Sequence, residues 1–402
     1  MKFLHTSDWQ LGRPFSHVED PAKRQSLRQV RLDAIGRIGE AAHDNGCAFV
    51  VVAGDLFDST TPDDTTVHEA CVRIGRMGLD VYAIPGNHDH AGPDGVWEQP
   101  FFLRHAARAP NLHILVERKP VVRNDAVILP FPLFRRQDSG DVLDWIRKPG
   151  ALEGLPEDRP WIALVHGSVQ DFGGESDRDE DDDASVQPNL LDLDALRKAA
   201  RPDFIALGDW HGCKGIAADA WYSGTPEQDR FPKGAGYRAG LALVVDVPGR
   251  GAPPVATPVE TGAVRWTELS AHLSDSASLD DLARRLGGPA AGDAPGSCLR
   301  LVLDGFLGFD DRKRLDEEVL RDARAAAMRF KLEDRVVPKP SAAELDSLRN
   351  RADDPLISRV AARLDDRSRD PARSEEDRRA ALAALEQLYL LASPGNGRTP
   401  RP

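Results

Sequence analysis

The sequence predicts a layered α/β domain, followed by a small second α/β unit and a helical C-terminal segment. Three observations support this fold class. Short β-rich runs alternate with helical stretches over the first 245 residues, a Pro/Gly-rich stretch follows at residues 248–258, and helix-start signals recur after residue 340. Alternation of strands and helices is typical of sheets that are covered by helices.

Apolar runs predict the strands of the first domain. They lie at residues 2–6, 47–53, 81–84, 126–129, 161–165, 204–207 and 241–245. The run at 47–53 is apolar throughout, as expected for a strand that is buried on both faces. Residues 24–45 predict a helix, because Leu27, Ile35 and Ile38 fall near one helical face. We therefore expect residues 1–245 to form the first domain.

Strand and helix patterns alternate again after the Pro/Gly-rich stretch, at residues 264–269, 279–286, 299–303, 310–325 and 328–332. A small α/β unit over residues 246–340 fits this order. Ser341 and Glu344 have the spacing of a capping box, and Asp354 and Ser374 begin two further helices. Residues 341–402 are therefore expected to be helical, with a disordered tail after Ser393. The acidic run at 175–183 is interpreted as a solvated loop.

The composition of the 402 residues excludes several classes of protein. No apolar run approaches the roughly 20 residues of a membrane span, and the first residues lack the apolar stretch of a signal peptide. The four cysteines are widely spaced and form neither a zinc motif nor a disulfide framework, so we expect a cytoplasmic protein. A net charge of −13 excludes binding of nucleic acid through bulk positive charge. It does not exclude a nuclease whose carboxylates hold metal ions.

Five short motifs bring Asp, Asn and His to the ends of predicted strands. They are Asp8-Trp9-Gln10, Gly54-Asp55, Gly86-Asn87-His88-Asp89, His166-Gly167 and Gly208-Asp209-Trp210-His211. Ligands gather beyond the carboxyl ends of strands in such sheets, so we expect these side chains to converge. Mixed oxygen and imidazole donors suit a pair of divalent cations. Two metals roughly 3.5–4 Å apart can clamp the attacking and leaving oxygens of a phosphoryl transfer.

In this order the motifs resemble the pattern of the calcineurin-like metallophosphoesterase superfamily, which is D-x-H, G-D, G-N-H-D, H and G-H-x-H. Within that superfamily, residues 4–12 and 222–227 are similar to the Mre11/SbcD nucleases. The resemblance implies a metallophosphoesterase sandwich followed by a small capping domain. It also implies two metal positions, one held by Asp8, Gln10, Asp55 and His211 and the other by Asp55, Asn87, His166 and Asp209.

The resemblance further implies roles beside the metals for two residues. His88 would stabilise the transition state or protonate the leaving oxygen, and Asp89 would orient His88. Two metal positions depart from the pattern, because Gln10 and Asp209 stand where His is usual. Both replacements keep an oxygen that can bind a cation. Oxygen-rich sites favour Mn²⁺ or Mg²⁺, so we predict two divalent ions and dependence on manganese.

Other residues near the motifs have ordinary roles in our interpretation. His5 is expected to be a structural histidine of the first strand, and Trp9 and Trp210 are expected to pack against the site. Basic residues flank the motif-bearing loops and fit contacts to a phosphate backbone as well as they fit a solvated surface. They are Arg13, Arg135, Arg136, Lys214, Arg230, Lys233 and Arg238.

The predicted reaction is metal-dependent hydrolysis of DNA phosphodiester bonds, by exonuclease or endonuclease action, in DNA repair or processing. The resemblance also implies a homodimer that works with an ABC-type ATPase of the Rad50/SbcC kind, docked through the C-terminal helices. Two alternatives stay open at this point. One is a small-molecule phosphodiesterase or phosphatase of the same fold, and the other is a non-catalytic subunit that recruits the ATPase.

Overall fold

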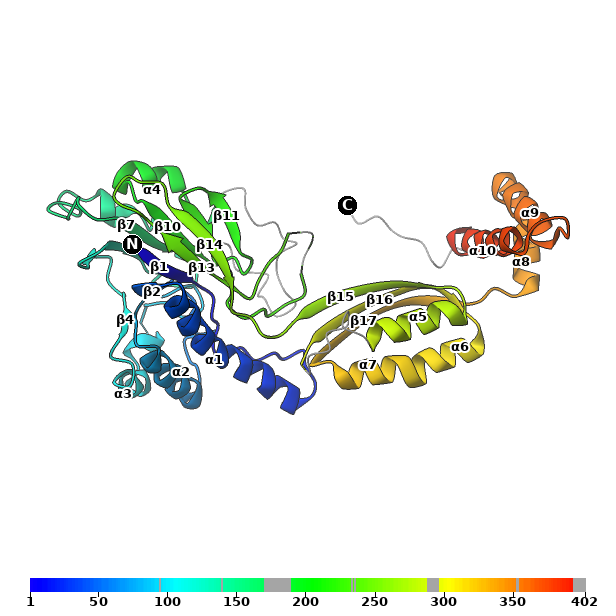
Figure 1. The fold of residues 1–402 in the computed structure, drawn as a ribbon, viewed down its shortest axis with the longest axis horizontal. Coiled ribbons are helices and arrows are strands. Elements are labelled where there is room, and N and C mark those ends of the chain that lie inside the picture. The colour runs from blue at the N-terminus through cyan, green and yellow to red at the C-terminus, as the bar shows by residue number, and fades with distance from the viewer. Residues whose placement is uncertain are drawn as a thin grey trace. The chain divides into compact units, whose positions relative to one another are not determined.

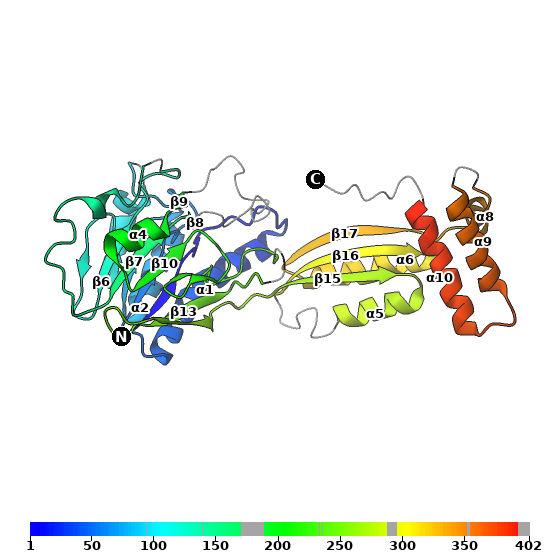
Figure 2. The same cartoon turned by 90° about the horizontal axis from the view of Figure 1, so that it is seen from above.

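The computed structural model describes residues 1–93, 95–138, 140–169, 189–232, 234, 236–287, 296–351 and 354–392. The chain divides into two compact units, Met1–Trp266 and Thr267–Pro402 (Figures 1 and 2). The acidic run at 175–183, Lys233 and the tail after Ser393 lie outside the described residues. In the part of the chain that is described, no helix combines the length and the apolar character that a membrane crossing requires.

The first unit contains two six-stranded sheets, of which one has the order β14-β13-β1-β2-β3-β4. Strands β1 to β4 run parallel to one another, while β13 and β14 are antiparallel to their neighbours. The strands are β1 Lys2–Thr6, β2 Phe49–Val52, β3 Asp80–Ala83, β4 Leu112–Ile114, β13 Leu241–Asp246 and β14 Val255–Glu260. Every residue of β2 is buried, as its apolar sequence predicts.

The other sheet of the first unit has the order β11-β12-β10-β7-β6-β5. Its inner strands β12, β10, β7 and β6 are parallel, and the edge strands β11 and β5 are antiparallel. The strands are β5 Val121–Val122, β6 Val127–Phe131, β7 Trp161–His166, β10 Phe204–Gly208, β11 Lys214–Ala217 and β12 Ala220–Tyr222. A short parallel pair, β8 Ser168–Val169 and β9 Leu190–Leu191, follows β7.

Helices cover the outer faces of the two sheets, which pack against each other (Figure 1). On the first sheet lie α1 Pro21–Asp44, α2 Asp64–Met77 and α3 Pro100–Ala106, and on the second lies α4 Leu193–Ala200. The core between the sheets includes Phe3 and Phe49 from one and Phe204 from the other, with the Phe3 and Phe49 ring centroids 5.4 Å apart. The predicted layered α/β sandwich is therefore confirmed.

The two sheets bring the carboxyl ends of five strands to one region. The loops that follow β1, β2, β3, β7 and β10 carry the five motifs of the sequence, and His166 is itself the last residue of β7. The carboxyl ends of neighbouring parallel strands lie at the same edge of a sheet. The five motifs therefore lie close together at that edge. This placement creates the site described below.

The first unit extends beyond residue 245, where the sequence placed the end of the first domain. Strand β14 pairs with β13 along its length despite the prolines around it, and the division between the units falls after Trp266. The buried Glu227 ties the following segment to this unit. Its carboxylate accepts the backbone N–H groups of Ala263 at 2.8 Å and Val264 at 3.0 Å, and it pairs with Arg37 of α1 at 2.6 Å.

The second unit begins with a three-stranded sheet and the helices that cover it. The sheet has the order β15-β16-β17, with β16 and β17 parallel. Leu301 and Leu303 of β16 pack with Leu279 and Leu282 of α5 in one apolar core. The elements are β15 Trp266–Leu273, α5 Ser276–Leu286, β16 Cys298–Leu307, α6 Phe309–Arg314, a π-helical turn Leu315–Val319, α7 Leu320–Ala326 and β17 Arg329–Pro338.

Three helices end the second unit: α8 Ala342–Arg349, α9 Pro355–Arg369 and α10 Glu375–Ala392. Leu348, Ala361 and Leu385 form their small common core. The capping box expected from the sequence starts α8, because the Ser341 backbone N–H donates to Glu344 Oε2 at 2.7 Å and Ser341 Oγ accepts from the Glu344 N–H.

We expect Glu227→Ala to lower the free energy of unfolding by about 2–4 kcal/mol, because it removes the acceptor of two backbone N–H groups and the partner of Arg37. Urea unfolding followed by circular dichroism measures the change. Glu260→Ala, at an exposed position of edge strand β14, is the control and should shift stability by less than about 0.5 kcal/mol. Equal stability of the two variants would contradict the tying role of Glu227.

Candidate metal centre

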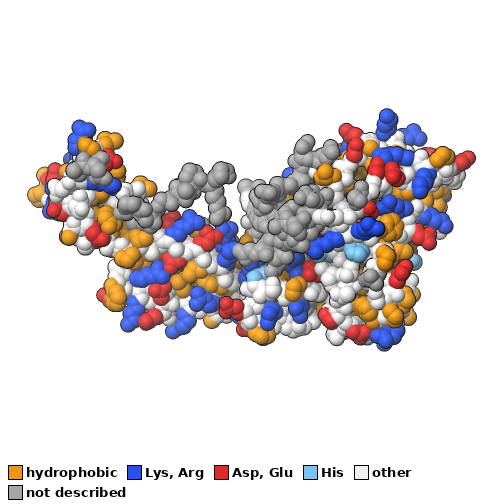
Figure 3. Space-filling view, turned by 180° about the vertical axis from the view of Figure 1, so that it is seen from behind, with side chains coloured by type: hydrophobic (Ala, Val, Ile, Leu, Met, Phe, Trp, Pro, Cys, Tyr) orange, Lys and Arg blue, Asp and Glu red, His pale blue; other side chains and the backbone are white. Residues whose placement is uncertain are grey.

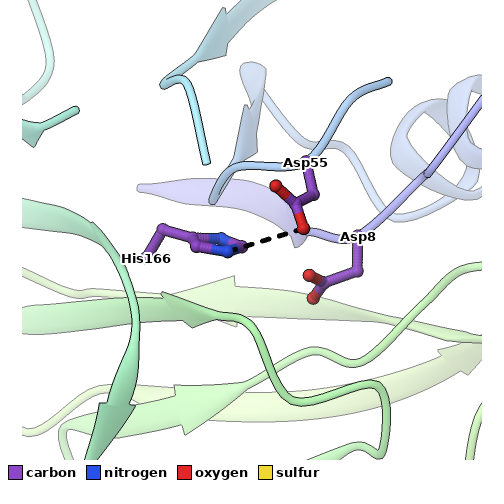
Figure 4. A group of neighbouring side chains, drawn as sticks. All are labelled: Asp8, Asp55 and His166. Atoms are coloured by element: carbon purple, nitrogen blue, oxygen red, sulfur yellow. Dashed lines mark ion pairs between the residues drawn. The ribbon is translucent and has the colours of Figure 1, made fainter. Parts of the chain in front are cut away.

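Three buried side chains from three strand ends form the centre of the site. Ligand atoms of Asp8, Asp55 and His166 all lie within 4.8 Å of one another. Figure 4 shows the three side chains converging, with His166 Nε2 3.6 Å from Asp55 Oδ2. None is more than 2% exposed to solvent. Two carboxylates and an imidazole that share one buried space are a donor set suited to a divalent cation.

The oxygens predicted for the second metal position surround His166 Nε2. Asn87 Oδ1 lies 3.4 Å away, Asp55 Oδ2 3.6 Å and Asp209 Oδ1 3.7 Å. Adjacent ligands of one octahedral cation, each about 2.1 Å from it, are separated by about 3 Å. The three oxygens therefore lie slightly farther from His166 Nε2 than adjacent ligands of one cation would. Asp209, which stands where the superfamily pattern has His, is one of the three residues whose oxygens lie near this nitrogen.

The backbone at four predicted ligands has a conformation that is rare for residues other than glycine. The φ angles are 53° at Asp8, 41° at Gln10, 55° at Asp55 and 102° at Asp209. Backbone strain of this kind is stored at functional sites and is held there by surrounding contacts. Here the loops hold each other, since the Asp8 N–H donates to the Gly54 carbonyl at 3.1 Å and the Gln10 N–H to the Asp55 carbonyl at 2.9 Å.

Gly86 lets the loop after β3 approach the loop after β2. A Cβ atom at this position would lie 2.1 Å from Asp55 Oδ1 and 2.6 Å from the Asp55 backbone nitrogen. The close approach allows the His88 N–H to donate to Asp55 Oδ1 at 2.9 Å. The glycine of the G-N-H-D motif is thus required by its close packing against Asp55.

His88 and Asp89 are adjacent in sequence but hold different parts of the site. The ring nitrogen Nδ1 of His88 donates to the Asp58 carbonyl at 3.0 Å, which orients the imidazole. Asp89 instead accepts the N–H groups of Phe57 at 3.0 Å and Gly86 at 2.7 Å. Among the described residues no hydrogen bond joins the Asp89 carboxylate to the His88 ring. The His88 ring thus contacts the Asp58 carbonyl, whereas the Asp89 carboxylate joins the loop that contains Phe57 to the loop that contains Gly86.

The remaining predicted ligands, Gln10 and His211, each have a partner of their own. Gln10 Oε1 accepts a hydrogen bond from Arg13 Nη1 at 2.5 Å. His211 Nδ1 donates to the buried Asp229 at 2.9 Å, and this leaves Nε2 as the nitrogen for a metal. Arg230 lies against the same pair. Burial opposes ionisation of Asp229, but the charges of Arg230, His211 and Arg13 outweigh it and lower its pKa well below the ordinary value.

Asp209 is held by residues from two other loops. Ser168 Oγ donates to Asp209 Oδ2 at 2.6 Å, so Oδ1 is the oxygen left toward His166. Asn87 Nδ2 lies 3.4 Å from the same Oδ1, and the Asp209 backbone N–H donates to Asp8 Oδ1 at 3.1 Å. These contacts explain how a carboxylate is accommodated where the superfamily pattern has an imidazole.

The segment 222–227, which resembles the Mre11/SbcD nucleases in sequence, contacts two of the loops that carry predicted ligands. The Tyr222 hydroxyl donates to the Gly167 carbonyl at 2.7 Å, next to His166. Ser223 Oγ lies 2.9 Å from Ser7 Oγ, which in turn donates to Asp8 Oδ2 at 2.5 Å. The segment therefore fixes two of the loops that present ligands.

Sequence reasoning missed four residues that shape the site: Asp58, Ser168, Asp229 and Arg31. Arg31 is buried in α1 and donates to the carbonyls of Trp9 at 2.9 Å and Asp8 at 3.3 Å and to Thr225 Oγ1 at 2.9 Å. The sequence does contain an indication of this role. Arg31 is four residues from both Leu27 and Ile35, so a charged side chain falls on the apolar face of the helix. The other three act through contacts that sequence spacing does not reveal.

His5 and Trp9 have the structural roles that the sequence suggested. His5 is fully buried, and burial lowers its pKa to about 3, so the ring is neutral. It packs edge-on against Phe204, with the ring centroids 6.0 Å apart. Trp9 is 1% exposed and donates its ring N–H to Thr6 Oγ1 at 3.0 Å.

Without a cation, the buried charges of the cluster are balanced by protons. Burial alone would lower the pKa of His166, but Asp55, Asp8 and Asp209 outweigh it and raise the pKa to about 9. Burial opposes ionisation of Asp55, yet the imidazoles of His166 and His88 and the His88 N–H lower its pKa below the ordinary value. His166 is therefore protonated at neutral pH, and a metal must displace that proton.

We expect Mn²⁺ binding at about pH 7.5 to release about one proton from His166 and to strengthen as the pH rises toward 9. The proton competes with the metal below this pKa, and the competition ends above it. Titration calorimetry in buffers of different ionisation enthalpy measures the release. His166→Gln keeps an oxygen donor but should abolish it, so equal release from this variant would contradict the assignment.

Comparisons with known proteins agree with this geometry. Residues 1–213 match the calcineurin-like phosphoesterase family. The chain is 32% identical over 174 residues to the SbcD component of the nuclease SbcCD of Escherichia coli strain K12, a match that covers 41% of this chain and 39% of that protein. It is 32% identical over 97 residues to the DNA double-strand break repair protein Mre11 of Archaeoglobus fulgidus, covering 23% of this chain and 20% of that protein.

A third relative is the uncharacterized metallophosphoesterase YhaO of Bacillus subtilis strain 168, which is 30% identical over 103 residues, or 24% of each chain. The matches to these three relatives thus span about two fifths of their length or less. The family match is longer and covers 213 of the 402 residues. Because it extends over more than half of the chain, the protein belongs to the calcineurin-like phosphoesterase family, whose members are hydrolases with a divalent metal site.

Proposed function

We propose that this protein is a metal-dependent DNA nuclease that hydrolyses phosphodiester bonds at a dinuclear metal centre. The observation that carries the proposal is the buried convergence of Asp8, Asp55 and His166 at the strand ends. The names of two relatives, a nuclease component and a DNA double-strand break repair protein, support DNA as the substrate. The name of the second relative supports a role in DNA repair or processing, and the widely spaced cysteines support a cytoplasmic location.

The chain offers donors for two cations. Asp8, Gln10, Asp55 and His211 would hold one, and Asp55, Asn87, His166 and Asp209 would hold the other. When bound, the cations supply Lewis acidity that neutralises the charge on the phosphoryl group. The donors are rich in oxygen, and this favours Mn²⁺, with Mg²⁺ as the second choice.

A cleft beside these donors supplies the remaining groups for the reaction. It has a volume of about 300 Å³ and is lined by Arg13, Asp58, Asn87, His88, His90 and Arg136 among others. The two arginines would contact substrate phosphates, which positions the strand without reading its sequence. Basic and acidic side chains are interspersed over the visible surface in Figure 3, so such contacts are local.

His88 would deliver a proton to the leaving sugar oxygen. Burial by itself lowers the pKa of His88, but Asp55 and Asp58 outweigh burial and raise the pKa above its ordinary value. The shift favours the protonated ring that a general acid requires. Its Nδ1 is engaged by the Asp58 carbonyl, so Nε2 is the nitrogen that serves the substrate.

The C-terminal helices would dock a Rad50/SbcC-like ABC-type ATPase, and the chain would act as a homodimer. Leu356 and Val360 of α9 and Leu391 of α10 are 65%, 40% and 83% exposed, which leaves apolar surface for a helical partner. The name of the Escherichia coli relative, which is one component of SbcCD, supports an assembly of this kind.

We expect the purified chain to degrade labelled linear duplex or single-stranded DNA in the presence of Mn²⁺. Asp55→Ala should be inactive because it removes the carboxylate shared by both metal positions, while Asp194→Ala, at a surface position 93% exposed, should match the wild type. Gel analysis across Mn²⁺, Mg²⁺, Zn²⁺ and Fe²⁺ measures the metal preference. Best activity with Zn²⁺ would contradict the inference from oxygen-rich donors.

The same preparation distinguishes the alternatives. Turnover of bis-p-nitrophenyl phosphate or cyclic nucleotides without DNA cleavage would indicate a small-molecule phosphoesterase. Tight metal binding without hydrolysis of any phosphoester would indicate a non-catalytic subunit that recruits an ATPase. Either pattern, obtained with the ATPase partner present, would overturn the nuclease proposal.

We expect His88→Ala to slow DNA cleavage by about 10²–10⁴-fold, the usual contribution of a positioned acid. Mn²⁺ and DNA should still bind, because the metal donors are untouched. Single-turnover cleavage measures the rate, and His113→Ala, a change to a histidine paired with Asp80, is the control. A wild-type rate in the His88 variant would show that another group protonates the leaving oxygen.

A further inference from the structure

Arg13 brings a buried positive charge to one side of the candidate metal centre. It is 3% exposed, and its Nη1 lies 2.5 Å from Gln10 Oε1, 3.5 Å from Asp229 Oδ2 and 3.6 Å from Asp58 Oδ1. Asp229 in turn accepts the Nδ1 hydrogen of His211. The guanidinium is therefore linked to Gln10 directly and to His211 through one carboxylate.

Gln10 and His211 are two of the three donors, with Asp8, that belong to the first metal position and not to the second. The Gln10 oxygen that would bind a cation already accepts a short, charge-assisted hydrogen bond. The second position has a different environment. Among the described residues, the ion pairs of Asp55 and Asp209 are with His166, and no arginine or lysine pairs with either carboxylate.

We propose that the two metal positions are unequal because of Arg13. The position with Asp55, Asn87, His166 and Asp209 binds its cation first and tightly. Arg13 weakens the position with Asp8, Gln10 and His211 in two ways. It donates a hydrogen bond to the Gln10 oxygen that would bind the cation, and its positive charge repels a second cation in a medium of low dielectric. Arg13 thereby controls how many ions the centre holds at a given Mn²⁺ concentration. The inference rests on the proposed dinuclear centre and assigns Arg13 as a positioning residue within it.

Mn²⁺ titration of the full chain, followed by the electron paramagnetic resonance signal of free Mn²⁺, tests the inference without using activity. The wild type should bind one ion with a dissociation constant at least about tenfold lower than that of the second. Arg13→Gln should bring the two constants together by strengthening the weaker position. Arg13→Lys keeps the charge, so the weaker position should stay weak.

Arg136→Gln is the matched control, because it removes the same charge from the same cleft. Arg136 lies beside His88 and His90 and not beside Gln10. Its charge is one of the causes that lower the pKa of each of these two histidines. The ratio of the two constants should therefore be unchanged. If circular dichroism shows that Arg13→Gln is unfolded, Gln10→His serves in its place. This change removes the oxygen to which Arg13 donates, so it should strengthen the weaker position.

Two equally tight ions in the wild type, or an unchanged ratio in folded Arg13→Gln, would overturn the inference while leaving the nuclease proposal in place. If Arg13→Gln does not fold, an unchanged ratio in Gln10→His would do the same. Metal binding by the wild type also tests the dinuclear centre separately from the role of Arg13. A folded wild type that binds no more Mn²⁺ than Asp55→Ala would overturn the dinuclear centre itself, and with it this inference.

Discussion

Two carboxylates, Asp8 and Asp55, lie buried against His166, and the loops of the first unit are arranged around that buried charge. Burying like charges together is costly unless cations or hydrogen bonds compensate. The chain compensates in part, through the Ser7 hydroxyl on Asp8 and the His88 N–H on Asp55. The proton held by His166 balances much of the rest until a cation replaces it. Strained backbone at both carboxylates is the structural cost of bringing them together.

The two-sheet sandwich makes this convergence possible. Asp8 and Asp55 come from the sheet that contains β1 and β2, whereas His166 ends β7 of the other sheet. The large core between the sheets keeps the strand ends at a fixed separation. Arg31 then fastens α1 to the backbone of the first ligand loop. A rigid scaffold of this kind holds charged groups close together, as preorganised electrostatic catalysis requires.

The sequence carries the parts of this arrangement that are local. Apolar runs that end in Gly or Asp locate the central strands and their motifs, and Ser341 with Glu344 locates a helix start, because each signal lies within a few residues. The sequence does not predict strand β14, because the proline and glycine residues around it weaken the strand pattern. Its strand conformation depends on antiparallel pairing with β13. The roles of Asp229 and Asp58 depend on contacts between loops. For Asp89, the family resemblance implied a role in orienting His88, and in the structure its carboxylate accepts the N–H groups of Phe57 and Gly86.

The central claim is that buried donors from both sheets form one metal centre, and a crystal structure of the protein soaked in Mn²⁺, with anomalous scattering recorded at the manganese edge, tests it most directly. The account predicts a strong anomalous peak about 2.2 Å from donor atoms of Asp55, Asn87, His166 and Asp209. A weaker peak should lie near Asp8 and His211. Manganese bound only elsewhere, with this cluster of side chains unchanged and without a peak, would contradict the account.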